Sequence, residues 1–285
     1  MPHVPTRRSA LDAPGVRTVL ALGAVIGLVI GLSTFILHAR LDPFADVHAY
    51  YDAGARLNAG RPLYEQPAGT DDADFYRYPP LLAIAFRPLA LLPFETAAWL
   101  WEAVLLALFA ATVIRMGLRN RWTWLTLGWL AAPVAWSLVI GQAQVAVTFL
   151  LAMGSPLGVA TATHLKLLPA LVAVFWIARR DWASFGRFVG WTVGLGVLSF
   201  VLEPAGSIAF LGFTDLAQVG NVENRSLFAI SPVLWVGSTA ILVVLAYRFA
   251  ASRAGWALAV AASVFASPRL LLYQLSTLMA TVPRG

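Results

Sequence analysis

The sequence predicts an all-α, polytopic membrane protein, and three observations support this fold class. Of its 285 residues, 59% are hydrophobic and only 12% are charged, which is more apolar surface than a water-soluble domain can bury. Several stretches approach the roughly 20 consecutive apolar residues that cross a bilayer as a helix. These stretches are continuous rather than alternating, which excludes a transmembrane barrel. We expect one integral membrane domain over residues 1–285, with about 8 to 10 membrane segments.

The arginines predict how this domain is oriented. They gather in short connections, which face the cytoplasm when they are rich in positive charge. The residues concerned are Arg7, Arg8, Arg17, Arg115, Arg119, Arg121, Arg179, Arg180, Arg187, Arg248 and Arg253. Because these loops explain the net charge of +6, we expect no nucleic-acid partner; membrane lipids are the expected surroundings. The chain has no cysteine, so disulfides and thiolate chemistry are excluded.

The N-terminal part is expected to be a cytoplasmic tail (residues 1–18) and a first span, about Val19 to Ala39. Its apolar core is longer than that of a signal peptide and no small-x-small cleavage site follows, so we expect a retained anchor. Residues 40–95 then form a long, polar and aromatic loop on the outer face. Loops of this length are usually functional or disordered, and the aromatic content argues against disorder. Within it, a helix from Asp46 to Asn58 is expected to lie in the membrane interface.

Three further spans are expected at about Ala97 to Ile114, Trp122 to Ile140 and Val145 to Met153. The first of these runs inward, because arginines follow it, and the next returns outward. A tight turn at Gly141–Gln144 joins the last two on the outer side.

The stretch from Pro156 to Ala178, taken as one helix, conflicts with the alternation of inward and outward spans. As one helix, it would place Arg179 and Arg180 on the outer face, against the positive-inside rule. Pro169 cannot continue a helix, so we expect a break near Lys166 and two short helices that return to the same side. Short, broken helices are tolerated where they line a cavity rather than face lipid.

The remaining segments follow the same alternation. We expect spans at Phe188 to Leu202, Leu227 to Tyr247 and Trp256 to Ala266, and the start of another at Leu270 to Val282. A second outer loop, residues 203–226, is expected to carry an interfacial helix from Ser207 to Val219.

Asp46 is the strongest candidate for a catalytic residue, with Tyr50 one helical turn later on the same face. Two interpretations are open. Asp46 is either a helix N-cap, which aspartate favours, or a general base held beside an aromatic wall. Asp42 and Asp52 are the alternative carboxylates, although Asp42 precedes proline and is typical of a turn.

The candidate phosphate-binding residues are Lys166, Arg225 and Arg269. Lys166 is the one lysine of the chain and lies in an apolar stretch, where an ionisable group usually has a function or a partner. Snorkelling to the surface is the alternative. Asn224 and Arg225 suit hydroxyl and phosphate groups, as does Arg269, but an ordinary polar loop with a helix cap fits them equally well.

Gln142 and Tyr78 complete the candidate set, although each has a simpler interpretation. Gln142 fits a tight turn, and Tyr78 precedes two prolines that favour an extended chain. The histidines His38, His48 and His164 lack the spacing of metal ligands, so we expect neither a metal nor another cofactor.

Together, these segments resemble glycosyltransferase family 87, the polyprenyl-phosphate-mannose-dependent α-mannosyltransferases of the GT-C superfamily. The matching elements appear in order from Asp46 to Ser267. They are Asp46-Val-His-Ala-Tyr-Tyr-Asp-Ala-Gly54, Ala59-Gly-Arg-Pro-Leu-Tyr64, Tyr76-Arg-Tyr-Pro-Pro80, Arg87-Pro-Leu-Ala-Leu-Leu-Pro93, Trp99-Leu-Trp101, Gly141-Gln-Ala-Gln144, Lys166-Leu-Leu-Pro169, Asn224-Arg-Ser226 and Ser267-Pro268.

The resemblance implies a GT-C-like helical bundle in the plasma membrane with its active site on the non-cytoplasmic side. It also implies that Asp46 is the catalytic base and that a polyprenyl-phosphate sugar is the donor. The sugar would be mannose, with arabinose or another sugar as alternatives, and the acceptor a lipid or a glycan. One base and a direct displacement imply inversion at the anomeric carbon. Lys166, Arg225 and Arg269 would then neutralise the leaving phosphate, without a metal.

Two departures leave other interpretations open. The chain ends at Gly285 within an expected span, and Ser267-Pro268 continues as Arg269-Leu-Leu rather than as a histidine-containing stretch. A short member, a truncated member and an inactive member of the family all fit. From another functional class, a transporter or flippase for a lipid-linked or anionic solute would also use broken helices and a buried lysine, but paired half-repeats are missing. A non-catalytic membrane scaffold is the third alternative.

Overall fold

The computed structural model describes residues 13–64, 76–212 and 223–282. Within them every regular element is a helix, as the sequence predicts. Three helices are long and apolar enough to cross a membrane: α1 (Pro14–Leu41), α4 (Phe94–Met116) and α10 (Trp182–Leu202). Their outward side chains are mostly exposed, as expected of helices that face lipid.

The other described helices are shorter. The α-helices are α2 (Ala45–Asn58), α3 (Pro80–Phe86), α5 (Arg121–Trp129), α6 (Ala131–Val139), α7 (Gln144–Met153), α8 (Pro156–Leu165), α9 (Val174–Ala178), α11 (Pro204–Gly212), α12 (Pro232–Arg248) and α13 (Arg253–Phe265). The 3₁₀ helices are η2 (Leu89–Leu91), η3 (Leu168–Ala173), η4 (Leu227–Ala229) and η5 (Leu272–Thr281).

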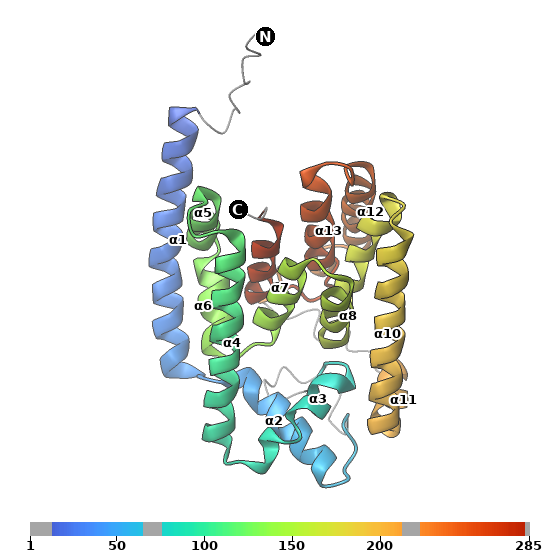
Figure 1. Ribbon diagram of the computed structural model, residues 1–285. Coiled ribbons are helices and arrows are strands. Elements are labelled where there is room, and N and C mark those ends of the chain that lie inside the picture. The colour runs from blue at the N-terminus through green and yellow to red at the C-terminus, as the bar shows by residue number, and fades with distance from the viewer. Residues whose placement is uncertain (1–12, 65–75, 213–222, 283–285) are drawn as a thin grey trace.

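The bundle has two different ends (Figure 1). Helices α2 and α3 lie across one end, below α7 and α8, whereas α1, α4 and α10 run along the length of the bundle. The beginning of α1, the end of α4 and the beginnings of α5 and α10 lie at the opposite end. The arginine-rich connections therefore gather at one end, as the sequence predicts.

The predicted break in the stretch from Pro156 to Ala178 is confirmed. Helix α8 ends at Leu165, and Lys166 adopts an extended conformation with φ −150° and ψ 127°. The chain then continues as η3 and α9, which end at Ala178. Because the two halves fold back on each other, Lys166 occupies the turn between them.

Two other predicted spans are wrong as continuous helices, and proline accounts for both. The segment Trp122 to Ile140 is divided at Leu130 into α5 and α6, since Pro133 has no N–H to bond the carbonyl one turn earlier. The segment Leu227 to Tyr247 is divided into η4 and α12, which begins at Pro232.

Two more predicted helices differ in type or extent. The predicted span at Leu270 to Val282 is the 3₁₀ helix η5, which starts at Leu272. The predicted interfacial helix at Ser207 to Val219 begins earlier, as α11 at Pro204, and its residues after Gly212 lie outside the described part of the chain.

A stripe of glycines, which the sequence analysis did not identify, holds α1 against α5 and α6. Gly23, Gly27 and Gly31 are spaced by four residues and share one face of α1. A Cβ atom at Gly27 would lie 2.1 Å from the carbonyl oxygen of Gly128, and one at Gly31 would lie 2.6 Å from Cβ of Ala131. Small residues at this spacing allow two helix backbones to approach closely within a membrane.

Candidate functional site

Asp46 lies in the first turn of α2, at the end of the bundle that α2 crosses. The N-cap of this helix is Phe44, which has a φ of 60°, so the interpretation of Asp46 as the N-cap is wrong. The backbone N–H groups of Phe44 and Asp46 donate to the carbonyl oxygens of Val139 and Ile140, at 3.0 and 3.1 Å. These bonds fix the start of α2 against the end of α6.

Gln142 holds the carboxylate of Asp46. Its Nε2 donates to Oδ2 of Asp46 at 2.6 Å, and its Oε1 accepts from the hydroxyl of Tyr50 at 2.8 Å. The Tyr78 hydroxyl lies 3.2 Å from both amide atoms. The structure therefore brings four of the predicted residues, Asp46, Tyr50, Tyr78 and Gln142, into one hydrogen-bond network.

The turn before α7 places Gln142 in this network, and glycine is required for it. Gly141 has a φ of 68°, which favours glycine, and a Cβ there would lie 2.2 Å from Cγ2 of Val47. Trp101 donates from Nε1 to the carbonyl oxygen of Gly141 at 2.8 Å. The close approach of this turn to α2 explains why Gln142 reaches Asp46.

The aromatic wall expected beside Asp46 is present. Tyr50 is fully buried, and its ring centroid lies 5.2 Å from that of Tyr78, 5.3 Å from Phe86 and 6.2 Å from Trp101. Tyr50 and Tyr78 join this group of rings to Gln142, which in turn bonds the carboxylate of Asp46.

Three cationic side chains lie close enough to act electrostatically on Asp46. Burial raises the pKa of Asp46 to about 6, and the charges of Lys166, Arg269 and Arg77, in that order, oppose this rise. The hydrogen bond from Gln142 opposes it as well. A carboxyl group with this pKa is mostly ionised at neutral pH and still basic enough to accept a proton.

The predicted cations Lys166 and Arg269 come together from distant parts of the chain. Lys166 Nζ lies 5.4 Å from the ring centroid of Tyr78 and 5.1 Å from that of Tyr273. Lys166 and Arg269 also repel each other electrostatically. Cationic side chains at this position can donate charge-assisted hydrogen bonds, which suits an anionic ligand such as a phosphate.

The other two predicted residues, Asn224 and Arg225, have a different position. The side chain of Asn224 donates to the carbonyl oxygen of Pro268 at 3.0 Å and accepts from the N–H of Leu270 at 2.9 Å. Arg225 is exposed, and its backbone N–H donates to the carbonyl oxygen of Leu270 at 2.8 Å. Both residues therefore hold the loop that carries Arg269, and Arg225 is not among the charges that act on Asp46.

Sequence reasoning missed two members of the site, Arg77 and Tyr273. Arg77 lies within the Tyr76–Pro80 element, between two residues that were noticed for their aromatic rings. Tyr273 follows Arg269 in an apolar run, and only the fold of η5 brings it to Lys166. The position of Arg77 between Tyr76 and Tyr78 in a family element could have indicated its role, whereas no sequence pattern indicates Tyr273.

A small cavity of about 40 Å³ adjoins Lys166. Its polar lining comes from Gln144, Lys166, Ser263, Ser267, Gln274 and Thr277. Within the described part of the chain, Oε1 of Gln144 and Oε1 of Gln274 accept no hydrogen bond. The cavity has room for about one or two water molecules or a ligand hydroxyl group. The described residues contain no group of three His, Asp or Glu side chains that would hold a metal ion.

Comparison with known proteins gives one family and several relatives. The model of glycosyltransferase family 87 matches residues 75–282. A polyprenol-phosphate-mannose-dependent alpha-(1-2)-phosphatidylinositol pentamannoside mannosyltransferase of Mycolicibacterium smegmatis is 27% identical, over 72% of this chain and 59% of the relative. The protein of the same name from Mycobacterium tuberculosis is 30% identical, over 79% of this chain and 62% of the relative. No solved structure matches the chain significantly.

A third relative has a related printed activity. It is a polyprenol-phosphate-mannose-dependent alpha-(1-2)-phosphatidylinositol mannoside mannosyltransferase of Mycolicibacterium smegmatis, 29% identical over 58% of this chain and 45% of the relative. The chain therefore spans about three fifths of the length of the first two relatives, and less than half of the third.

Proposed function

Because this chain belongs to glycosyltransferase family 87, we propose that it transfers a sugar from a polyprenyl-phosphate donor to a lipid or glycan acceptor. The names of its relatives favour mannose as the sugar and a phosphatidylinositol mannoside as the acceptor. The observation that carries the proposal is the position of Asp46, which Gln142 holds beside the cations Lys166, Arg269 and Arg77. That arrangement supplies a base and an anion site within reach of one another.

In the proposed reaction, Asp46 acts as the general base. The acceptor hydroxyl oxygen forms a bond to the anomeric carbon while its proton passes to the carboxylate of Asp46. The bond between the anomeric carbon and the donor phosphate breaks, and its electron pair leaves with the phosphate oxygen. Lys166, Arg269 and Arg77 stabilise the negative charge that develops on this oxygen. The polyprenyl chain lies along the apolar helices.

A single displacement of this kind inverts the anomeric carbon. The linkage named for the relatives is alpha, so an inverting enzyme that makes it requires a β-linked donor. A synthetic polyprenyl phosphate with a β-linked sugar should therefore be consumed, whereas its α-linked isomer should not.

The proposed active site faces the non-cytoplasmic side of the plasma membrane. Helices α2 and α3 cross one end of the bundle near Asp46, and the arginine-rich connections gather at the other end (Figure 1). Positive connections remain in the cytoplasm. A polyprenyl-phosphate sugar on the outer leaflet would thus meet the site directly.

The substitution Asp46→Asn tests the proposal in purified protein with a labelled polyprenyl-phosphate sugar. Turnover should fall by about 10²- to 10⁴-fold, because the amide cannot accept the proton. The melting temperature at pH 8 should not fall. The raised pKa means that the charged carboxylate is disfavoured in the fold, and asparagine removes that charge.

The matched control is Asp42→Asn. The carboxylate of Asp42 accepts a hydrogen bond from Nδ1 of His38 at 2.7 Å and is not part of the Gln142 network, so turnover should stay near that of the wild type. Full turnover by Asp46→Asn would place the base elsewhere. A wild-type protein that transfers no sugar in detergent would favour a transporter or a scaffold instead.

A further inference from the structure

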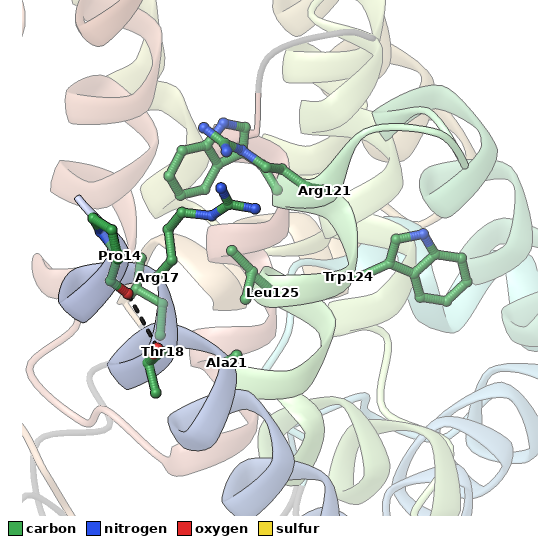
Figure 2. Close-up of a pocket in the computed structure, with 9 residues that line it drawn as sticks. Pro14, Arg17, Thr18, Ala21, Arg121, Trp124 and Leu125 are labelled. Atoms are coloured by element: carbon green, nitrogen blue, oxygen red, sulfur yellow. Dashed lines mark hydrogen bonds between the residues drawn. The ribbon is translucent and has the colours of Figure 1, made fainter. Parts of the chain in front are cut away.

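A second cleft lies between α1 and α5, at the end of the bundle opposite to α2. Its volume is about 610 Å³. The residues that define it are Arg17, Thr18 and Ala21 of α1 and Arg121, Trp124 and Leu125 of α5. Figure 2 shows the side chains of Arg17 and Arg121 extending toward each other across the opening, with Leu125 and Ala21 beneath them.

The packing of α1 against α5 gives this cleft a fixed shape. The contact of Gly27 with Gly128 fixes α1 against α5 about three turns below Arg17. Helix α1 begins at Pro14 and α5 begins at Arg121, so the N-termini of both helices open on the cleft. Their positive dipole ends add to the attraction that the arginines exert on an anion.

Among the described residues of α1 and α5, the charged side chains at the cleft are Arg17 and Arg121. Residues 13–41 and 103–130 contain no aspartate or glutamate, so the two helices supply only positive side chains. An anion that lies between the two guanidinium groups can accept charge-assisted hydrogen bonds from both. Arg121 also lies over the ring of Trp122, 5.0 Å from its centroid, which orients its side chain.

The rest of the cleft is apolar. Leu20, Ala21 and Leu125 form its floor, and Trp124, which is 56% exposed, lies at its edge. Below the cleft, the exposed side chains of α1 are aliphatic, as Val19 and Leu22 are. A free phosphate would use only the arginines, whereas a ligand with both an anionic head and a hydrocarbon chain would use the arginines and the apolar surface.

We propose that this cleft binds the headgroup of an anionic phospholipid, with the phosphate between Arg17 and Arg121 and the acyl chains along α1 and α5. Basic pockets between membrane helices on the cytoplasmic side bind such headgroups, and the arginine-rich connections predict that orientation here. The site is separate from the cluster around Asp46 and does not depend on the reaction proposed for it.

Native mass spectrometry of the purified full chain, titrated with phosphatidylglycerol or with phosphatidylcholine of the same acyl chains, tests the proposal. The wild type should retain phosphatidylglycerol preferentially. The double variant Arg17→Gln/Arg121→Gln should bind phosphatidylglycerol roughly 25-fold more weakly, about fivefold for each arginine, with phosphatidylcholine unchanged. Ala21→Trp keeps both charges but fills the cleft, and it should lose the same preference.

The matched control removes two arginines elsewhere in the arginine-rich connections. Arg180 and Arg248 are both exposed, and the variant Arg180→Gln/Arg248→Gln should keep the preference for phosphatidylglycerol. Equal loss in the two double variants would show that net charge, rather than the cleft, attracts the lipid. Unchanged retention after Arg17→Gln/Arg121→Gln, or full displacement of the lipid by millimolar inorganic phosphate, would overturn the proposal.

Discussion

Gln142 donates a hydrogen bond to Asp46 across 2.6 Å and can present only its amino group to that carboxylate. Its carbonyl oxygen is fixed on the other side, because it accepts from the buried hydroxyl of Tyr50 at 2.8 Å. Tyr50 therefore orients the amide of Gln142, and this amide orients the carboxylate of Asp46. Gln142 acts on the proposed chemistry through Asp46, as a positioning residue.

Replacing Gln142 with leucine should change the pH dependence of the reaction as well as its rate. The hydrogen bond from Gln142 lowers the pKa of Asp46, so its loss should move the acidic limb of kcat/KM to higher pH. The buried Tyr50 hydroxyl would also lose its shorter hydrogen bond and keep the one to Tyr78 at 3.3 Å, which costs about 0.5 to 1.5 kcal/mol of stability. Gln144→Leu is the control: Gln144 bonds Thr277 instead, so it should cost stability without moving the limb. An unmoved limb in Gln142→Leu would mean that the bond does not tune Asp46.

The wild-type activity should decline as the pH falls below about 6, the pKa to which burial raises Asp46. The base must be ionised to accept a proton, so kcat/KM should drop about tenfold per pH unit below that point. Arg77→Gln removes a charge that lowers this pKa, so the limb should shift upward. Arg225→Gln should leave the limb in place, because Arg225 is not among the charges acting on Asp46. A rate that is independent of pH between 4 and 7 would exclude Asp46 as the base.

If Lys166 and Arg269 hold the donor phosphate, removing either side chain should weaken binding mainly of ligands that carry this phosphate. Lys166→Ala should weaken binding of the polyprenyl-phosphate sugar far more than binding of the matching polyprenol, and Lys166→Arg should retain part of it. Two cations that share one ligand should give non-additive losses in the double variant Lys166→Ala/Arg269→Ala. Isothermal titration with both ligands measures this.

Arg225→Ala serves as the comparison for these two cations, because its side chain is exposed beside the same loop. The sequence analysis placed Arg225 with the phosphate ligands, so a large phosphate-dependent loss in this variant would support that prediction over the arrangement in the structure. Additive losses that are equal for both ligands would mean that Lys166 and Arg269 have a structural role.

The sequence predicted the fold class and the break at Lys166 because both follow from single segments. The length of an apolar run predicts a span, and the side on which the arginines lie predicts where a span must turn back. It predicted Asp46, Tyr50, Tyr78, Gln142, Lys166 and Arg269 as candidates, and the structure brings these six together. It could not predict which residue pairs with which, since the pairing of Gln142 with Asp46 depends on a turn at Gly141 that fits against Val47. The same limit explains why Tyr273 was missed.

The glycine stripe of α1 should be sensitive to side-chain volume. Gly27→Leu would place atoms where the carbonyl oxygen of Gly128 lies, so α1 must separate from α5, and the melting temperature of the detergent-solubilised protein should fall by several degrees. Gly190→Leu is the matched control, because nothing lies within 4 Å of a Cβ at that position of α10. Equal melting temperatures for the two variants would show that α1 contributes little to the fold.

The orientation of the bundle can be tested because the chain has no native cysteine. Single cysteines at the exposed positions Ala59 and Glu95 should react with a membrane-impermeant maleimide added to intact cells, since both belong to the loop that carries Asp46. Cysteines at the exposed positions Arg119, Arg180 and Ser252 should react only with a permeant maleimide, because they lie in the arginine-rich connections. Arg180 is decisive. It lies just before α10, whose beginning is at the end of the bundle opposite to α2, so labelling of Arg180→Cys from outside would place the arginine-rich end on the outer side and refute an outward-facing site.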